Sequence, residues 1–337
     1  MNILVTGGTG FIGSHTCVEL INAKHNCIIV DNLYNSSIKV LDRIETITGV
    51  KPKFYEIDLL DKDALEKVFK ENKIDAVIHF AGYKAVGESV SIPLTYYKNN
   101  ITGSLNLYEL MDKYNVDNLV FSSSATVYGG NYESPLKEEY KRGETTNPYG
   151  STKSMNEIII TDFAYAKKTL SAVLLRYFNP IGAHESGLLG EVPNGIPNNL
   201  LPYVAQVAEG KREYIGVFGN DYDTFDGTGV RDYIHVVDLA RAHVLAIEYA
   251  TKHKGVEIFN VGTGNGYSVM ELIRSYSKAC GRELPFKIQA RRAGDVATSF
   301  ADPTKAYKLL GFKAEYDLDR MCEDSYRFYK NNPNGIE

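Results

Sequence analysis

The sequence is poor in cysteine and contains no apolar run long enough to cross a bilayer. Its four cysteines lack the close pairing typical of metal sites, so we expect no metal and buried thiols in a reducing, cytoplasmic compartment. The first residues, MNILVTGG, carry no basic flank or cleavage site, and we interpret them as a first strand. We therefore expect no membrane partner.

No stretch of the chain concentrates positive charge. The 37 Lys and Arg residues and 42 Asp and Glu residues are mixed along the sequence, for a net charge of −5. Because binding to nucleic acid needs a basic patch or stripe, we expect no nucleic-acid partner. The hydrophobic share of 44% and the charged share of 23% are typical of a folded globular protein.

Short β-branched runs alternate with helix-length segments over the first half of the chain. The runs lie at 3–6, 27–31, 53–57, 76–79, 119–122 and 172–177. This alternation predicts an α/β fold with a doubly wound parallel (Rossmann) sheet in a domain of residues 1–180. From Pro180 the chain is richer in Gly, Pro and Asn, and we expect a smaller, interleaved α/β substrate domain at 181–337. Strand-like runs at 233–237 and 257–261 lie in segments near 233–261 that we expect to return to the first sheet.

A glycine-rich turn follows the first predicted strand. Gly7-Gly8-Thr9-Gly10-Phe11-Ile12-Gly13 leads into an apolar helical pattern, and such glycines let the backbone approach a pyrophosphate at the start of a helix. The spacing is GxxGxxG and differs from GxGxxG. Asp31, 18 residues after Gly13, can bind both adenosine ribose hydroxyls and would repel a 2′-phosphate, so we predict NAD rather than NADP. The alternative is a connecting turn with Asp31 as a strand-end cap.

Two later strand ends fall on the same expected edge of the sheet. Asp58 could bond the adenine amino group, and Gly82 would allow close approach of the cofactor. Either residue could equally belong to an ordinary loop.

A phenol and an ammonium group form the candidate chemical site. Tyr149 and Lys153 are four residues apart, which places them on one helix face, and a nearby cation stabilises a phenolate. Alone, such a pair is more often an exposed helix pair. Ser122-Ser123-Ser124 lies at the carboxyl end of the fifth predicted strand, at the expected cofactor edge, so we predict that Ser124, Tyr149 and Lys153 form one proton-transfer unit.

Longer strings, distributed over essentially the whole chain, resemble the UDP-galactose 4-epimerase family of extended short-chain dehydrogenases. They are LVTGG at 4–8, HFAG at 79–82, FSSSATVYG at 121–129, LRYFNP at 175–180, GIPNNL at 195–200 and GVRDYIH at 229–235. The resemblance implies an enzyme that holds NAD and epimerises the 4-hydroxyl of a UDP-hexose through a 4-keto sugar, in galactose metabolism. Tyr149 would remove the proton, Ser124 would share its transfer, and Lys153 would hold the nicotinamide ribose and lower the pKa of Tyr149. The family is usually a homodimer, here packed through parts of 94–114 and 152–167.

The motifs and the resemblance together give the candidate contacts. For NAD we expect Gly7, Gly10, Phe11, Ile12, Gly13, Asp31, Asn32, Asn35, Ser36, Asp58, Leu59, Phe80, Ala81, Gly82, Lys84, Asn99, Ser122, Tyr149, Lys153, Tyr177 and Phe178. For the UDP-sugar we expect Ser124, Ala125, Thr126, Tyr149, Asn179, Asn199, Leu200, Gly216, Val217, Phe218, Arg231, Arg292, Asp295 and Ser299. Arg231 and Arg292 suit a diphosphate because a guanidinium binds its oxygens bidentately.

Ser299 departs from the family pattern. Many members of the family carry a tyrosine at this position, which borders the 2-substituent of the sugar. We expect the small Ser299 to admit an N-acetyl group, so that UDP-GlcNAc and UDP-GalNAc are also converted. The alternative is a neutral polar substitution.

Three rival functions fit the residues less well. A 4,6-dehydratase of the same family carries an Asp-Glu pair where this chain has Ala125 and Thr126, which cannot serve as its acid and base. A UDP-glucuronate epimerase or decarboxylase is disfavoured by the match in the second half of the chain. A non-catalytic NAD-sensing scaffold would have no need of Ser124, Tyr149 and Lys153 together.

Overall fold

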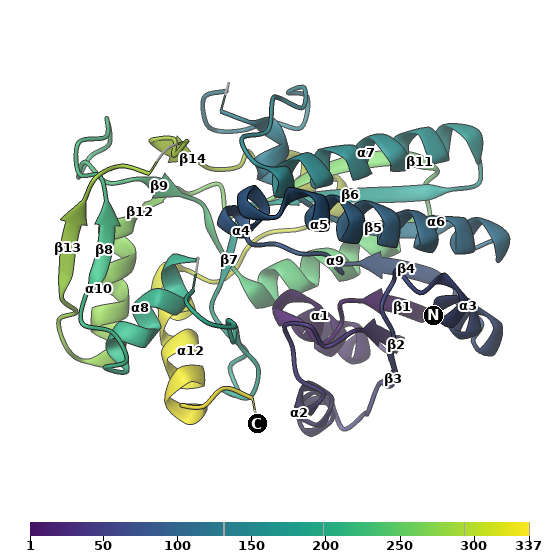
Figure 1. Cartoon of the computed structure of the whole chain (residues 1–337), viewed down its shortest axis with the longest axis horizontal. Helices are drawn as coiled ribbons and strands as arrows, with labels where there is room; N and C mark the ends of the chain where they lie inside the picture. Colours follow the sequence, from purple (N-terminus) through teal and green to yellow (C-terminus); the bar gives the residue numbers. More distant parts are fainter. Residues whose placement is uncertain (131, 198, 293, 337) are drawn as a thin grey trace.

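A seven-stranded parallel sheet forms the centre of the larger half of the molecule (Figure 1). The computed structural model describes residues 1–130, 132–197, 199–292 and 294–336, so Asn198 of the expected motif at 195–200 lies outside the described residues. The strands are β1 (Asn2–Thr6), β2 (Asn26–Asp31), β3 (Lys53–Glu56), β4 (Ala76–His79), β5 (Asn118–Ser124), β6 (Ser171–Tyr177) and β11 (Gly255–Val261). Their order in the sheet is β11-β6-β5-β4-β1-β2-β3.

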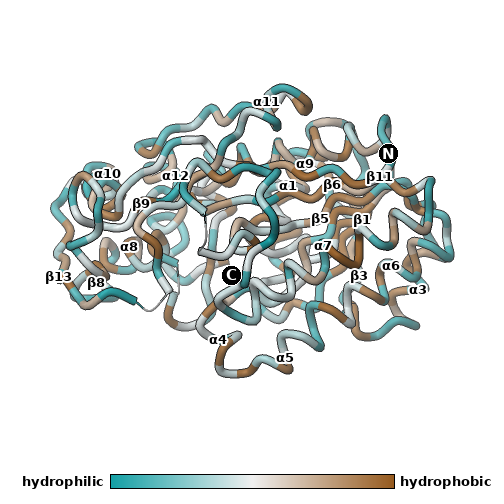
Figure 2. The backbone as a smooth tube through the Cα atoms, turned by 90° about the horizontal axis from the view of Figure 1, so that it is seen from above, coloured by the Kyte–Doolittle hydropathy of each residue, from teal (hydrophilic) through white to brown (hydrophobic). Residues whose placement is uncertain are grey.

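Helices cover both faces of this sheet, because its strands are apolar on both sides. One face packs against α1 (Phe11–Asn22), α2 (Lys39–Thr48), α9 (Val236–Ala250) and α11 (Thr304–Leu310). The other packs against α3 (Lys62–Glu71), α6 (Gly103–Lys113) and α7 (Pro148–Ala166). Hydrophobic residues run through β1, β5 and β6 in the middle of the tube in Figure 2. The predicted doubly wound α/β fold is confirmed.

The smaller half has its own hydrophobic core and short sheets. Its helices are α8 (Leu200–Ala208), α10 (Val269–Cys280) and α12 (Leu318–Asn331). Its strands pair as β8 (Ile215–Phe218) with β13 (Phe286–Gln289), β9 (Val230–Arg231) with β12 (Tyr267–Ser268) and β14 (Thr298–Ser299), and β7 (Asn179–Ile181) with β10 (Tyr233–His235). The division into two domains at residue 180 stays a prediction.

One expected strand is shorter than the pattern indicated. The run 233–237 is strand only to His235, because the His235 ring caps α9, which starts at Val236, by accepting at Nδ1 from Val237 N at 3.0 Å. Strand β11 lies beside β6 in the large sheet, with Gly255 opposite Ser171.

Short helices lie near the carboxyl edge of the large sheet. They are α4 (Val86–Ser91), α5 (Pro93–Tyr97), the π-helical turn η1 (Lys98–Thr102) and the 3₁₀ turn η2 (Ala125–Tyr128). None of the described helices is both long and apolar enough to cross a membrane. Within the described residues, no cluster of three or more His, Cys, Asp or Glu side chains could bind a metal.

Candidate active site and cofactor site

The order of strands brings the predicted cofactor residues to one crevice. Strands β1 and β4 are neighbours in the sheet but far apart in sequence, so the turn after β1 and the turn after β4 meet at a topological switch point. A Cβ atom on Gly7 would lie 2.8 Å from the Ala81 backbone nitrogen, which shows how closely the two turns approach. Ligands of open parallel sheets bind at this place.

The glycine turn fits a pyrophosphate. Gly7 has a φ of +72°, a conformation that disfavours side chains, and a Cβ atom on Gly13 would lie 2.2 Å from the Gly7 carbonyl oxygen. Gly10 caps α1 without any side-chain hydrogen bond to the first turn of that helix. The glycines therefore keep side chains away from the start of α1, whose first N–H groups and positive end are suited to bind a diphosphate.

Asp31 lies beside this turn. The residue is 8% exposed, and its carboxylate accepts hydrogen bonds from Thr9 N at 3.1 Å and Leu33 N at 2.9 Å. The structure is compatible with both roles that the sequence suggested. Asp31 orders the loop as a strand-end cap, and it also lies next to the glycines of the predicted NAD site. Ser36 Oγ lies 2.7 Å from Thr9 Oγ1, whereas Asn35 is exposed.

The remaining predicted adenosine contacts form a chain of hydrogen bonds across two loops. Asn32 Nδ2 donates to Asp58 Oδ2 at 2.9 Å, and Asp58 also accepts from Leu60 N. Leu59 is buried against α6, where a Cβ on Gly103 would lie 3.1 Å from its Cβ. These contacts hold the loops after β2 and β3 in one place.

Aromatic and amide side chains pack against the turn after β4. Phe80 packs on His243, with ring centroids 4.6 Å apart. A Cβ on Gly82 would lie 3.2 Å from Asn100 Oδ1, and Asn99 donates to that same oxygen at 2.9 Å. Asn99 lies in the π-helical turn η1, a kind of irregularity that is frequent at functional sites.

Tyr149 and Lys153 both lie in the first two turns of helix α7. Asn147 caps the helix by accepting from Gly150 N at 2.9 Å, and Pro148 follows at the first helical position. The Lys153 ammonium lies 5.9 Å from the centre of the Tyr149 ring and donates to Ser122 O at 2.6 Å. The predicted pair is therefore close in space, with the ammonium directed at the end of β5.

Burial shifts both of these groups toward their neutral forms. It lowers the pKa of Lys153 to about 8. Burial also raises the pKa of Tyr149, and a hydrogen bond with Ser124 offsets part of that rise. The protein alone thus leaves the phenol protonated near neutral pH, so a phenolate here needs further positive charge.

The end of β5 supplies the other hydroxyl groups. Ser124 is 8% exposed and caps η2, accepting from Thr126 N at 3.2 Å and from Thr126 Oγ1 at 3.0 Å. Ser122 Oγ hydrogen-bonds the phenol of Tyr177, the last residue of the neighbouring strand β6. Ala125 and Thr126 form the partly exposed start of η2 beside this group, and Phe178 follows β6 at the same edge.

A buried ion pair beneath the hydroxyls has no counterpart in the sequence predictions. Glu157 on α7 accepts from Arg176 Nε at 2.9 Å and Nη2 at 2.6 Å, and from Ser123 Oγ at 2.5 Å. The side chains of Glu157 and Arg176 are at most 2% exposed. Glu157 follows Lys153 by four residues, so helical spacing alone could have indicated that it shares the buried face of α7.

The predicted diphosphate residues gather in the smaller half. Arg231 Nη2 lies 3.6 Å from Asp295 Oδ1, and Ser299 pairs with Arg231 across β14 and β9. Arg292 lies over the Phe218 ring, 3.8 Å from its centre. These residues come from separate segments, and the structure brings them to one side of the molecule.

Asp232 anchors this group, and sequence reasoning missed it. Its buried carboxylate accepts from Thr263 N at 2.9 Å, Gly264 N at 3.1 Å and Ala301 N at 3.1 Å. Burial raises its pKa, and these hydrogen bonds oppose the rise. Asp232 therefore fixes the segment that carries Ser299 against the strand that carries Arg231.

The other predicted nucleotide residues lie at element ends. Asn179 starts β7, Asn199 caps α8 without a side-chain cap bond, and Leu200 is the first residue of α8. Gly216 and Val217 lie in β8, where Gly216 approaches the Gln289 side chain of β13. The roles of all these residues as ligand contacts stay predictions.

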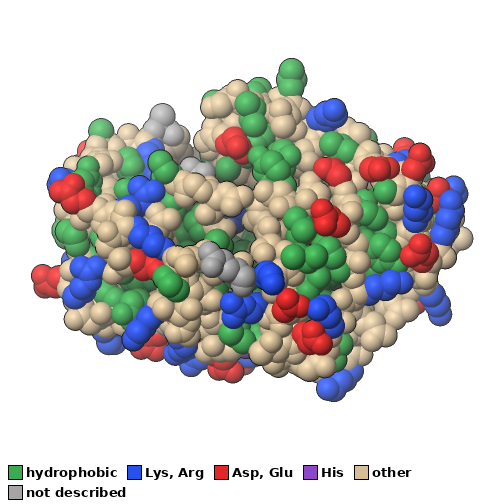
Figure 3. All heavy atoms as spheres, turned by 60° about the horizontal axis from the view of Figure 1, so that its bottom comes forward, with side chains coloured by type: hydrophobic (Ala, Val, Ile, Leu, Met, Phe, Trp, Pro, Cys, Tyr) green, Lys and Arg blue, Asp and Glu red, His purple; other side chains and the backbone are tan. Residues whose placement is uncertain are grey.

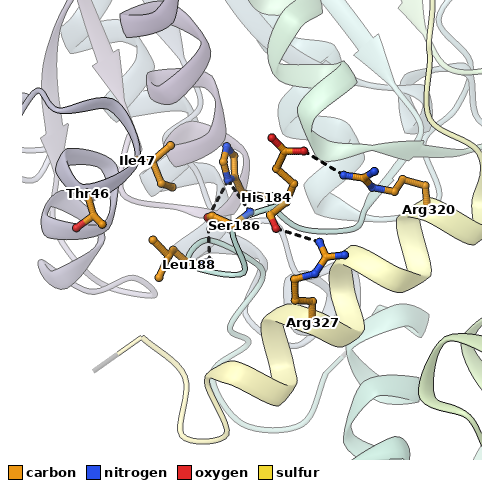
Figure 4. A pocket seen from close by; sticks show the side chains of 8 residues that line it. Thr46, Ile47, His184, Ser186, Leu188, Arg320 and Arg327 are labelled. Atoms are coloured by element: carbon orange, nitrogen blue, oxygen red, sulfur yellow. Dashed lines mark hydrogen bonds and ion pairs between the residues drawn. The ribbon is translucent and has the colours of Figure 1, made fainter.

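A separate pocket of about 530 Å³ lies between α2, the loop 184–188 and α12 (Figure 4). Figure 4 shows Arg320 and Arg327 reaching from α12 towards that loop. Both arginines already pair with the buried carboxylate of Asp324, and Arg320 also pairs with Glu185. None of the predicted site residues lines this pocket, so the crevice at the strand ends remains the candidate site.

The surface seen in Figure 3 carries interspersed acidic and basic side chains, and its outline is notched between the two halves of the molecule. Lys84, after β4, reaches across from the larger half to Glu191, whose side chain accepts its hydrogen bond at 2.8 Å. The predicted cofactor and nucleotide residues thus lie on the two sides of one boundary.

Known proteins match the whole chain. A model of the NAD dependent epimerase/dehydratase family matches residues 3–262. A UDP-glucose 4-epimerase of Bacillus subtilis is 58% identical over 337 residues, covering 100% of this chain and 99% of the relative. The crystal structure of a UDP-glucose 4-epimerase from Bifidobacterium longum in complex with NAD+ and UDP has a TM-score of 0.96 and 54% identity, covering 99% of this chain and 100% of that one. A Stenotrophomonas maltophila epimerase with bound NAD and formylated UDP-arabinopyranose has a TM-score of 0.96 and 48% identity, covering 99% of each chain.

Proposed function

Because the chain belongs to the NAD-dependent epimerase/dehydratase family, we propose that it interconverts UDP-galactose and UDP-glucose by NAD-dependent 4-epimerisation through a 4-keto sugar. The observation that carries the proposal is the gathering of Ser124, Tyr149 and Lys153 at the edge of the sheet where the glycine turn lies. The fold, the family and the NAD requirement are the confirmed parts of the sequence interpretation.

Tyr149 is the proposed base for the 4-hydroxyl. NAD, when bound, supplies a hydride acceptor, a hydride donor and a positive charge near the phenol. That charge and the Lys153 ammonium favour the phenolate, which burial alone disfavours. Ser124 bridges the sugar hydroxyl and Tyr149, so the proton moves over short hydrogen bonds.

The proposed reaction balances within one cycle. Tyr149 takes the hydroxyl proton as C4 loses its hydride, which leaves a ketone at C4. The sugar then turns and presents its other face, and C4 regains the hydride while Tyr149 returns the proton to the oxygen. NAD would supply the acceptor for this hydride and then return it, so no other oxidant or reductant is consumed.

In the proposed function, residues of the smaller half bind the nucleotide. Arg231 and Arg292 bind the diphosphate, and Asp295 orients Arg231. Asn179, Asn199, Leu200 and the β8 residues 216–218 complete the uridine pocket. The sugar can then turn while the diphosphate stays in place.

A finer part of the proposal concerns the sugar's 2-substituent. Ser299 is partly buried beside Arg231, and its side chain is small. We infer that this leaves room for an N-acetyl group, so that UDP-GalNAc and UDP-GlcNAc are converted as well. A pocket wide enough for an N-acetyl group still binds the plain hexose with little loss of affinity.

The proposed partner is a second copy of the chain. Apolar side chains are exposed on three neighbouring helices, with Leu94 81% exposed on α5, Leu105 39% on α6 and Ile158 43% on α7. A homodimer would bury them. Analytical ultracentrifugation of the parent protein and of Leu94→Asp checks this, with a loss of the dimer expected for the variant.

Proton NMR of the purified protein tests the proposal directly. With no NAD added, UDP-galactose and UDP-GalNAc are supplied in separate samples. Conversion of both supports epimerisation with retained NAD and an open pocket at Ser299. Conversion of UDP-galactose alone would contradict the proposal that N-acetyl sugars are converted. Failure with both sugars, persisting after NAD is supplied, would favour an acid-sugar substrate or a non-catalytic NAD protein.

A further inference from the structure

The carboxylate of Glu191 lies between a predicted cofactor residue and a predicted nucleotide residue. Its Oε1 atom accepts from Lys84 Nζ at 2.8 Å and from Asn199 Nδ2 at 3.3 Å. Lys84 belongs to the turn after β4, in the larger half, and Asn199 precedes α8 in the smaller half. One oxygen atom therefore joins both sides of the crevice.

The backbone around Glu191 is held by helix α12. Tyr329 Oη donates to the Glu191 carbonyl at 2.8 Å. A Cβ atom on Gly190 would lie 2.4 Å from the Phe328 ring, so only glycine allows this close packing. These contacts hold the backbone of Glu191 in a fixed position, and the carboxylate is then placed by Lys84 and Asn199.

Exposure differs sharply between the partners. The Glu191 side chain is 11% exposed and that of Lys84 is 49% exposed. An ion pair with one such open partner contributes little to overall stability. A mostly buried carboxylate nevertheless needs a positive partner, so removal of Lys84 leaves a poorly solvated negative charge beside Asn199.

We propose that Glu191 is a positioning residue that couples the cofactor side of the crevice to the nucleotide side. When Lys84 is held by the cofactor and by Glu191, the carboxylate holds the Asn199 amide in the orientation that receives the nucleotide. When Lys84 is absent, the unpaired carboxylate shifts Asn199 and disfavours an incoming diphosphate. The inference rests on the proposed function, because that proposal assigns Lys84 and Asn199 to the two ligands.

A double-mutant cycle tests the coupling. The four proteins are the parent, Lys84→Met, Glu191→Gln and the double variant, each purified with NAD, and calorimetry measures the Kd for UDP. We expect Lys84→Met to weaken UDP binding about 5-fold or more in the parent background and to change it less than about 2-fold in the Glu191→Gln background. A purely structural role of Glu191 would not produce this dependence on background.

Two further variants serve as controls. Lys84→Arg keeps the positive charge, so it should weaken UDP binding less than Lys84→Met does in the parent background. Tyr329→Phe removes the bond to the Glu191 carbonyl but leaves the carboxylate, so the effect of Lys84→Met should persist in that background.

The outcomes separate this inference from the proposed function. If the parent binds UDP and converts UDP-galactose, while Lys84→Met weakens UDP binding equally in both backgrounds or in neither, the coupling through Glu191 is wrong and the epimerase proposal stands. If the parent neither binds UDP nor converts the sugar, both proposals fall together.

Discussion

The Glu157 carboxylate and the Arg176 guanidinium form a two-bond ion pair at 2.9 and 2.6 Å, buried between α7 and β6. Ser123, which precedes Ser124 in β5, donates to the same carboxylate. The pair therefore ties the helix that carries Tyr149 and Lys153 to the strand that carries Ser124. It supports the candidate site from a buried position.

Removal of one partner of this pair should be costly. Glu157→Gln leaves the Arg176 charge buried and unpaired, and we expect the free energy of unfolding to fall by about 3–5 kcal/mol. Urea unfolding followed by circular dichroism measures the loss. Asp42→Asn, which breaks the exposed Lys51–Asp42 pair, is the matched control and should leave the urea midpoint unchanged. Equal midpoints for Glu157→Gln and the parent would contradict the structural role.

Tyr149→Phe removes the proposed base. Since a positioned general base typically contributes 10²–10⁴-fold, we expect kcat for UDP-galactose to fall by at least about 100-fold, with the NAD content of the protein unchanged. Tyr165→Phe changes an exposed tyrosine of the same helix and should keep full activity. A Tyr149→Phe protein with parental kcat would mean that another group takes the proton.

Lys153→Met tests the electrostatic role of the ammonium. The base is active as a phenolate, so activity rises with pH as Tyr149 deprotonates. Without the ammonium, the phenolate is less stable, and the rising limb of kcat should move to higher pH. A pH–rate profile of both proteins provides the measurement. A lower kcat with an unmoved limb would restrict Lys153 to holding the cofactor ribose.

Three buried histidines should make the folded protein less stable in mild acid. Burial lowers the pKa of His15 to about 3, of His79 to about 3 and of His243 to about 4, against 6.5 for the unfolded chain. Below pH 6.5 the unfolded chain therefore binds protons that the folded protein does not, so stability is full above 6.5 and falls as the pH decreases toward these values. Between pH 7.5 and 5.5 the three groups together should cost about 4 kcal/mol.

Urea unfolding at the two pH values measures that loss. His79→Gln provides the comparison: the variant should start from a lower stability at pH 7.5, since the bonds to Thr6 and Ser104 change. Between the two pH values, the free energy of unfolding of the variant should decrease by about one third less than that of the parent. An unaltered decrease would show that His79 does not contribute.

Ser299→Tyr tests the space beside the sugar. A tyrosine there should fill the room proposed for an N-acetyl group and abolish conversion of UDP-GalNAc, while kcat/KM for UDP-galactose changes less than about 10-fold. Ser299→Ala keeps a small side chain and should retain both activities. If Ser299→Tyr still converts UDP-GalNAc at the parental rate, the substituent lies elsewhere.

The sequence predicted the sheet well because parallel strands buried on both faces are continuous apolar runs. The glycine turn was recognisable for a similar reason, since its chemistry is local to residues 7–13. The expected strand at 233–237 was wrong at its end, because His235 caps a helix and β-branched Val236 and Val237 begin it. A short apolar run cannot distinguish those two structures.

The supporting residues were beyond sequence reasoning because they depend on distant partners. Asp232 is fixed by backbone groups at 263, 264 and 301, and Glu191 by Lys84, 107 positions away along the chain. Nothing in the segments around these residues signals such contacts. Glu157 is the exception, as its helical spacing from Lys153 was visible.

The position of β11 has a consequence for how the protein is made. This strand covers the edge of β6. At about 5–20 residues per second, synthesis of the segment between them takes roughly 4–15 s, during which the apolar β6 edge has emerged without its partner. An exposed edge can pair with the wrong chain. Aggregation during synthesis should therefore respond to the supply of chaperones and to translation speed between codons 178 and 254, even where the finished protein is unaffected.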